Sequence, residues 1–466
     1  ETLAAYAHTP GGRLKEIRHG NGIRTGYAYD TDGNLVHLHM EHTDGEILAD
    51  LYYSHDLNGN RTLKSGSRIG GEGKATEHKV SYIYDRVDRL VSETRQGEET
   101  AYVYDLCGNR LKKLDKSGEV EYHYNRKNQL ICHFSEKEKT AYRYDLQGNL
   151  LEAAGAEGTT VFSYNVFHQQ TAVTMSDGKR LENQYDAEYL RAGMVENGTV
   201  TTFSYHNGEL LAESSPDGDT ISRYIPGYGV AAGWNREYNG YHYYHLDEQN
   251  STAYITGSSG EIENQYGYDA FGVLQNSREE LPNRILYTGQ QYDQTSGQYY
   301  LRARFYNPVL GRFVQEDVYR GDGLNLYAYC KNNPVVYYDP SGYKKKHKPQ
   351  CKEEISAGES ETDVNWTDHG HKHFPDKNKP WKDTTKSTKN GPAKYSPDIK
   401  DIEAFEREAW EIGTPVTNGK NWKVKKYDEI IGATGGKETQ YVRIENSANT
   451  IHGHPISESE YLKLLK

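Results

Sequence analysis

The chain has 466 residues, a formal net charge of −12 and a hydrophobic fraction of 35 %. A chain of this length can form several domains and bury a large core, so its size excludes no fold class. Its 41 tyrosines and 46 glycines, against only 14 prolines, favour many short strands and turns over helices or disorder. No apolar run approaches the roughly 18 residues of a membrane-spanning helix, so no membrane segment is expected in this sequence.

The four cysteines are Cys107, Cys132, Cys330 and Cys351. They form no CxxC pair and no regular spacing, so they predict neither a disulfide framework nor a zinc site. The chain begins at Glu1 rather than at a methionine, and its first repeat starts within a few residues. We therefore expect it to be the C-terminal part of a longer protein, whose N-terminal signal would lie outside this sequence.

The motif Tyr-x-Tyr-Asp-x-x-Gly-Asn recurs through the first part of the chain. Clear copies begin at Tyr27, Tyr102 and Tyr142, and weaker copies contain Asp56, Asp186 and Asp269. Residues two apart in a strand share a face, so each Tyr-x-Tyr places two rings on one side. The Asp and the Gly-Asn supply a turn with positive φ. Each copy is therefore predicted to be a β-hairpin.

A single hairpin is barely stable, so the copies are expected to stack edge to edge and bury tyrosine against tyrosine. The predicted fold class is mainly β, with a coiling sheet of hairpins over residues 1–286. Periodic aromatic residues are usually core residues, so we interpret these tyrosines as structural. Carbohydrate binding by exposed rings is the alternative.

The segment 287–343 follows the repeats and differs from them in sequence. It contains YTGQQYD from Tyr287, GQYYLRARFYNP from Gly297 and GRF from Gly311. This segment and the repeats together resemble the Rhs, or YD-repeat, family over residues 10–343. The resemblance implies a hollow β-shell that encloses a C-terminal toxin domain, with residues 287–343 as the core segment at its border.

In the family, this core segment ends in an Asp-Pro-x-Gly element where the chain cuts itself. Here that element is DPSG from Asp339, followed by Tyr343, and the upstream counterpart contains Asp317. Two carboxylates that share a proton can activate water and protonate the leaving amide, as in aspartic proteases. The resemblance predicts self-cleavage after Tyr343 by Asp317 and Asp339, with Arg312 as the orienting cation and Asp322 in reserve. The alternative is that both aspartates only form turns.

The composition of the chain changes at residue 343. Residues 344–466 hold 22 Lys and Arg against 20 Asp and Glu, whereas the rest holds 33 against 47. The tail also contains four of the five tryptophans but only four of the 41 tyrosines. The basic, weakly periodic residues 344–361 predict a linker, and residues 362–466 are predicted to be a separate toxin domain.

The sequence of this tail predicts a small α+β domain. Ser396-Pro397-Asp398 is typical of a helix start, and apolar residues from Ile399 to Ile412 share one helical face before Gly413. Strands are expected at residues 422–427, 439–445 and 450–455. A capping box at residues 457–460 then predicts a short closing helix over residues 461–465.

Two histidine-rich elements mark the tail. His369, His371 and His373 alternate in the first, and His452 and His454 alternate in the second. Alternate residues of an extended strand face one way. Because imidazoles titrate near neutrality, two of them can act as general base and general acid in one turnover.

Arg443 and Glu445 alternate on the strand predicted beside the second element. Arg443, or alternatively Lys372 or Lys394, would stabilise the charge that develops on a phosphate. This set suits metal-independent cleavage of RNA, for which no cofactor is expected. The same histidines with Asp368 would suit a divalent metal, so a metal-dependent DNase is the alternative. Neither HExxH nor a zinc-finger spacing is present, which disfavours the metal.

The tail is similar to the polymorphic nuclease toxins that follow Rhs cores. The resemblance implies a bacterial toxin that is secreted or delivered at the cell surface and cleaves RNA in the cytoplasm of a competitor cell. Its expected partners are an RNA substrate, a cognate immunity protein and a secretion apparatus. A cell-surface adhesion or carbohydrate-binding protein with an inert tail is the alternative from another class, and the change of composition at residue 343 disfavours it.

Overall fold

The structure is a computed structural model that describes residues 2–70, 73–238, 240–319, 323–347, 365–367, 372–375, 379–399, 402–417, 420–427, 429–447 and 450–465. The chain divides into two compact units, Glu1–Ile355 and Ser356–Lys466. The division falls inside the segment 344–361 that the sequence predicts to be a linker. Strands dominate the described residues, so the predicted mainly β class is confirmed.

The first unit is built on one antiparallel meander of 26 strands, in which each strand pairs with the next one in sequence. The strands are β1 Ala4–His8, β2 Leu14–His19, β3 Arg24–Tyr29, β4 Leu35–Glu41, β5 Ile47–His55, β6 Arg61–Ile69, β7 Ala75–Tyr84, β8 Leu90–Arg95, β9 Glu98–Tyr104, β10 Arg110–Asp115, β11 Gly118–Tyr124, β12 Leu130–Ser135, β13 Lys139–Tyr144, β14 Leu150–Gly155, β15 Gly158–Tyr164, β16 Gln170–Thr174, β17 Arg180–Tyr185, β18 Arg191–Glu196, β19 Thr199–His206, β20 Glu209–Ser214, β21 Thr220–Gly227, β22 Gly229–Asn235, β23 Gly240–Leu246, β24 Thr252–Thr256, β25 Ile262–Tyr268 and β26 Leu274–Arg278.

The aspartate of each repeat closes its own turn, which we call the aspartate clamp. In the copy at Asp145, Oδ1 accepts hydrogen bonds from the backbone nitrogens of Gln147 and Asn149, both at 2.9 Å. The Asn149 side chain donates to the other carboxylate oxygen at 2.8 Å, and Gly148 adopts a φ of +88°. The same clamp recurs at Asp30, Asp56 and Asp105. The predicted hairpin with a Gly-Asn turn is therefore confirmed.

The Tyr-x-Tyr pairs lie on the face of the sheet that carries the core. Tyr102 is buried and Tyr104 is half-buried, whereas Val103 between them is exposed. Arg110 begins the next strand, β10, and its guanidinium lies 4.6 Å from the centre of the Tyr102 ring. Tyr124 of the next hairpin donates to the Arg110 carbonyl at 2.8 Å. Buried arginines thus pack between the rings, which the expectation of tyrosine against tyrosine did not include.

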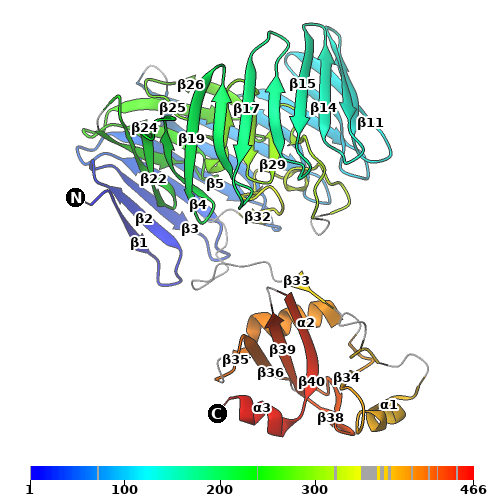
Figure 1. The fold of residues 1–466 in the computed structure, drawn as a ribbon. Coiled ribbons are helices and arrows are strands. Elements are labelled where there is room, and N and C mark those ends of the chain that lie inside the picture. Colours follow the sequence, from blue (N-terminus) through cyan, green and yellow to red (C-terminus); the bar gives the residue numbers. More distant parts are fainter. Residues whose placement is uncertain are drawn as a thin grey trace. The chain divides into compact units, whose positions relative to one another are not determined.

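The meander turns back on itself, so that β24 and β25 face the early strands (Figure 1). The Tyr254 hydroxyl contacts the carbonyl oxygens of Leu48 and Ile69, at 3.2 and 3.0 Å. Arg68 donates to the Tyr266 carbonyl at 2.8 Å. The core between these strands includes Leu38, Met40, Leu51, Tyr53 and Tyr254.

The core segment 287–343 packs against this shell from inside. Its elements are η1 Tyr287–Gly289, β27 Gln291–Asp293, β28 Gln298–Leu301, β29 Arg304–Asn307, β30 Arg312–Phe313, η2 Cys330–Asn332 and β31 Tyr337–Tyr338, and β32 Lys346–His347 follows. Strands β27 to β30 form a four-stranded antiparallel sheet. Tyr299, Tyr306 and Phe313 are fully buried and share a core cluster with Tyr224 and Tyr244 of the meander.

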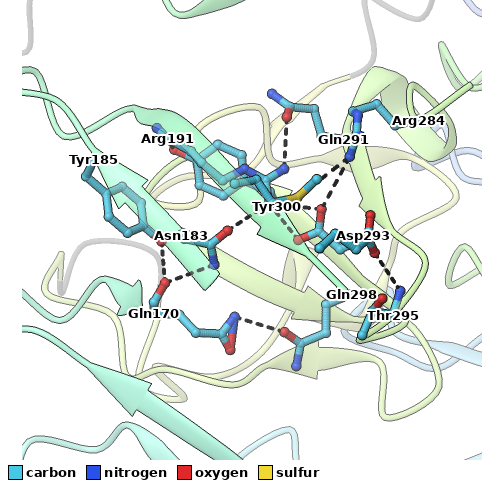
Figure 2. A network of polar contacts seen from close by, with 12 residues as sticks. Gln170, Asn183, Tyr185, Arg191, Arg284, Gln291, Asp293, Thr295, Gln298 and Tyr300 are labelled. Atoms are coloured by element: carbon cyan, nitrogen blue, oxygen red, sulfur yellow. Dashed lines mark hydrogen bonds and ion pairs between the residues drawn. The ribbon is translucent and has the colours of Figure 1, made fainter. Parts of the chain in front are cut away.

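A buried ion pair joins the core segment to the repeats (Figure 2). Arg191 Nη1 lies 2.9 and 2.7 Å from the two carboxylate oxygens of Asp293, and neither side chain is exposed. Arg191 Nη2 donates to Gln291 Oε1 at 2.9 Å, and the guanidinium lies 4.5 Å from the centre of the Tyr300 ring. Removal of one partner would leave an uncompensated charge in the core.

Asp293→Ala is expected to destabilise the first unit by about 3–5 kcal/mol, because the Arg191 guanidinium would stay buried without its counter-ion. Urea unfolding followed by circular dichroism measures this. The matched control is Glu152→Ala, which removes the partner of Arg143 from a surface ion pair with exposed fractions of 60 and 37 %. Because exposed pairs contribute little, the control should unfold almost as the wild type does. Equal effects of the two substitutions would contradict the prediction.

The second unit is a small α+β domain, as the sequence predicts. Its helices are α1 Trp381–Ser387, α2 Ile402–Ile412 and α3 Glu458–Leu464. One five-stranded sheet has the order β33 Asn365–Trp366, β40 Thr450–Ile456, β39 Tyr441–Ser447, β36 Trp422–Lys426 and β35 Thr414–Pro415. A second sheet contains β34 Lys394–Tyr395, β37 Gly432–Thr434 and β38 Lys437–Thr439.

Helix α2 covers one face of the larger sheet, where Ile402 and Ala409 join Val442, Ile444 and Ile451 in a buried cluster. The predicted strands correspond to β36, β39 and β40, and the predicted closing helix corresponds to α3. Of the predicted capping box, the N-cap bond is confirmed, since Ser457 Oγ accepts from the Glu460 backbone nitrogen at 3.3 Å, whereas the Glu460 carboxylate contacts Arg443.

Helix α2 begins later than predicted, because the residues around Ser396 form a separate turn in which Ile399 N donates to the Ser396 carbonyl. The sequence reading missed α1 and the hairpin of β37 and β38. Within the part of the chain that the structure describes, no helix is both long and apolar enough to cross a membrane.

Candidate functional sites

Four of the predicted catalytic residues, Arg443, Glu445, His452 and His454, lie on β39 and β40. The two strands are antiparallel, and their register pairs Arg443 with His454 and Glu445 with His452. Alternate residues share a face, so these four side chains lie on one face of the sheet. Ile444 and Ile451 point to the other face, where α2 covers them. The arrangement predicted from the alternation is therefore present in the structure.

Arg443 is the centre of this cluster. Its Nη2 lies 2.6 Å from Glu445 Oε1 and 3.2 Å from His454 Nε2. Its Nη1 lies 2.5 Å from Glu460 Oε1, and its guanidinium is 4.3 Å from the centre of the Trp422 ring. Two carboxylates and an indole thus fix the guanidinium beside the imidazole.

His373 joins the cluster from the first histidine element. Its ring stacks on that of His454, with centroids 5.1 Å apart and an interplanar angle of 20°. Its Nδ1 donates to the Ala393 carbonyl at 2.7 Å, which fixes the orientation of the ring. His369, His371 and Asp368 lie outside the described residues. Of the two alternative cations, Lys372 is exposed, and its charge contributes to lowering the pKa of His454. Lys394 is a residue of β34.

Burial and, as a second cause, the positive charge of Arg443 together lower the pKa of His454 to about 3. His454 is therefore neutral near pH 7, and its Nε2 accepts a hydrogen bond from Arg443. An imidazole with so low a pKa is a weak base near pH 7, because general bases work best when their pKa lies near the operating pH. The low pKa therefore does not assign the role of base to His454, and the order of base and acid stays as open as the sequence leaves it.

Glu406 supports this site, and the sequence reading missed it. Its carboxylate is 3 % exposed on α2, and Oε2 accepts from Trp366 Nε1 and from the Gly453 backbone nitrogen, both at 2.8 Å. Burial raises its pKa. A Cβ on Gly453 would lie 3.0 Å from Glu406 Cδ and 2.4 Å from Ile444 Cδ1, so the glycine lets the strand approach the carboxylate.

The pKa of His454 predicts an acid-sensitive second unit. Between about pH 6.5 and 3, the unfolded histidine binds a proton that the folded one does not, so stability falls as the pH decreases through this range. When the pH is lowered from 6.5 to 5, the free energy of unfolding should fall by up to about 2 kcal/mol less in His454→Gln than in the wild type. The raised pKa of Glu406 makes the free energy of unfolding increase as the pH falls, which is the opposite effect. The wild type and His454→Gln both keep Glu406, so this effect cancels in the comparison.

Thermal unfolding followed by tryptophan fluorescence tests this, because four of the five tryptophans lie in residues 344–466. The wild type measured at both pH values is the reference. An equal loss of stability in the wild type and in His454→Gln would contradict the prediction.

The predicted self-cleavage residues Asp317 and Asp339 also lie close together. Arg304 Nη2 is 2.7 Å from Asp317 Oδ2 and 3.7 Å from Asp339 Oδ2, and all three side chains are buried. They line a cavity of about 10 Å³ together with Tyr319, Leu326 and Cys330. This volume is close to the space that one water molecule needs.

The backbone of the DPSG element is held beside these carboxylates. Asp339 Oδ1 accepts from the backbone nitrogens of Ser341 and Gly342, at 3.0 and 2.8 Å, so this aspartate does form a turn. Arg304 Nε donates to the Gly342 carbonyl. A Cβ on Gly342 would lie 2.5 Å from the Leu301 carbonyl, so only glycine fits there. The element is therefore fixed one residue before the predicted cut, and Tyr343 itself is partly exposed.

Arg312 lies elsewhere. Its Nη2 donates to the Asn128 carbonyl at 2.5 Å, and its guanidinium lies 4.9 and 5.0 Å from the ring centres of Tyr124 and Tyr327. The cation beside the two aspartates is Arg304, so Arg312 does not occupy the place predicted for it. Asp322 lies outside the described residues.

A family model described as Teneurin YD-shell matches residues 68–335, which is more than half of the chain. The chain therefore belongs to the YD-shell family, the class of Rhs or YD-repeat proteins. This confirms the family that the repeats indicate.

Among curated proteins, the chain is 35 % identical over 170 residues to the tRNA3(Ser)-specific nuclease WapA of Bacillus spizizenii, a match that covers 34 % of this chain and 7 % of WapA. It is 33 % identical over 101 residues to the toxin protein Tse5 of Pseudomonas aeruginosa, with 22 and 8 % covered. The chain thus spans less than a tenth of the length of these relatives.

Among solved structures, the fold resembles the crystal structure of TcdB2-TccC3-TEV with a TM-score of 0.60. The sequences are 19 % identical, and the match covers 73 % of this chain and 19 % of the other. At this identity the likeness concerns the fold alone.

Proposed function

We propose that this chain is part of an Rhs-type bacterial toxin and that its second unit is a ribonuclease. The observation that carries the proposal is the cluster of Arg443 and His454, on one face of β39 and β40, with His373 stacked on His454. The similarity to a tRNA nuclease and to a toxin protein supports the class. Such a toxin requires an immunity protein in the producing cell and a secretion apparatus for delivery, and it acts in the cytoplasm of the recipient.

In this mechanism, one histidine of the cluster accepts the proton of an RNA 2′-hydroxyl. The 2′-oxygen attacks the adjacent phosphorus, and the bond to the 5′-oxygen breaks. Arg443 stabilises the charge on the phosphate, because its guanidinium is already fixed by Glu445 and Glu460. A second histidine of the cluster protonates the leaving oxygen. No step needs a metal ion.

Expression of residues 344–466 in a bacterium, followed by electrophoresis of total RNA, tests the proposal. The wild type should degrade RNA with or without EDTA. His454→Ala should lower the rate about 10²–10⁴-fold by removing one imidazole of the acid-base pair, and Arg443→Ala about 10²–10³-fold. Lys386→Ala is the matched control, because that side chain is 70 % exposed on α1.

Three results would overturn the ribonuclease. Intact RNA in cells that nevertheless die would reject it, and degradation of DNA that EDTA abolishes would replace it with a metal-dependent DNase. A tail without any effect on the cell would instead favour the adhesion or carbohydrate-binding protein.

We also propose that the chain cuts itself between Tyr343 and Lys344. One of the carboxylates of Asp317 and Asp339 takes a proton from water, which adds to the Tyr343 carbonyl, and the other donates a proton to the leaving nitrogen of Lys344. Arg304 supports this by holding both carboxylates and the Gly342 carbonyl together. Release of the second unit from the first would follow.

Mass spectrometry of the purified chain tests self-cleavage. The wild type should yield a fragment of residues 344–466, whereas Asp317→Asn and Asp339→Asn should stay intact. Asp219→Asn is the matched control, since its carboxylate belongs to an exposed ion pair with Arg236 and should not affect the cut. A wild type that remains a single uncut species would disprove this step and leave the ribonuclease proposal standing.

A further inference from the structure

Strands β4 and β5 carry a cluster of potential metal-binding side chains that belongs to neither of the sites described above. His37 and His39 alternate on β4, and the register places Asp50 of β5 directly opposite His39. Leu38 and Met40 of the same strand are buried in the core, so the histidines lie on the opposite face of the sheet. The three polar side chains are about 30 % exposed, which leaves solvent access on one side.

The potential ligand atoms converge on one point. Asp50 Oδ1 lies 2.7 Å from His37 Nε2 and 2.8 Å from His39 Nδ1. Each residue offers one ligand atom, and these three atoms lie within 4.8 Å of one another. Zinc binds imidazole nitrogen and carboxylate oxygen at about 2.0–2.2 Å, which puts the ligands of a tetrahedral site about 3.3 Å apart. A separation of the three side chains by about half an ångström therefore makes room for an ion.

Neighbouring residues hold two of the ligands in place. His39 Nε2, the nitrogen that does not face Asp50, lies 3.3 Å from Glu41 Oε2. Glu41 is paired in turn with Arg24 of β3. The His37 ring stacks on Tyr52, with centroids 4.3 Å apart and an interplanar angle of 10°. A carboxylate behind a metal-bound histidine is the usual arrangement in zinc sites, because it fixes the tautomer and the ring orientation.

We propose that His37 Nε2, His39 Nδ1 and Asp50 Oδ1 bind one divalent transition-metal ion of the zinc type. Two imidazoles with one carboxylate suit zinc, whereas calcium and magnesium prefer oxygen ligands alone. Water from the solvent side completes the coordination. The ion joins β4 to β5 on the face opposite the core, and it is independent of the chemistry proposed for the second unit.

The test uses the full chain, treated with a chelator, loaded with zinc and dialysed, and then measured for zinc content. His37→Ala and His39→Ala should each lose one equivalent of zinc relative to the wild type. This comparison isolates the site from the histidines of the second unit, which all the proteins keep. Glu41→Gln should bind zinc about 10–100-fold more weakly by calorimetry, because it loses the carboxylate behind His39.

His123→Ala is the matched control. His123 lies on the meander strand β11 with its Nε2 3.9 Å from Glu121 Oε2, and it is half exposed. This position therefore pairs one histidine with a carboxylate but offers no second histidine, so His123→Ala should leave the zinc content unchanged. Equal zinc content in the wild type and in His37→Ala would overturn the proposal.

A second measurement keeps the proposal testable if the alanine variants do not fold. Crystals of the wild type soaked in zinc should show an anomalous scattering peak between His37, His39 and Asp50. A map that shows zinc elsewhere on the chain but none between these side chains would equally overturn the site.

Discussion

The aspartate clamp is the interaction on which the first unit depends. Each repeat carboxylate accepts hydrogen bonds from the backbone of its own turn, as Asp145 does from Gln147 and Asn149, so each hairpin sets its register without help from distant residues. A shift by one residue would move every ring from the core face to the solvent face. The buried position of Tyr102, and of its counterpart Tyr27, therefore follows from the turn that comes after each of them.

Inside this regular wall, buried charges determine where the irregular core segment binds. Arg191 of the meander pairs with Asp293 of the core segment, which fixes where the segment binds. Within the segment itself, Arg304 holds Asp317 and Asp339 together. An apolar contact tolerates small displacements, whereas an ion pair without water does not, because its desolvation is compensated only at short range. The end of the core segment is consequently fixed at one place, beside the two carboxylates proposed to cut it.

The sequence predicts what depends on neighbours along the chain. Hairpins, turns, the helix α2 and the shared face of His452 and His454 follow from periods of two or 3.6 residues and from turn chemistry. The identity of the cation at the aspartates did not follow, since Arg304 and Arg312 are equally plausible until β29 is paired with the end of the segment. Glu406 lies on the apolar side of α2, four residues after Ile402, which was a readable signal. Its partner, Gly453, is 47 residues away and has no local signature.

The hydrogen bond between Glu406 and Gly453 separates the position of strand β40 from the identity of the side chains that the strand carries. On β40 the Glu406 carboxylate accepts from a backbone nitrogen, so this bond does not depend on which side chains stand on either side of the glycine. The backbone of β40 is therefore held in place independently of its histidine side chains. Substitution of these histidines can change the chemistry of this face while the bond to α2 keeps the strand in position.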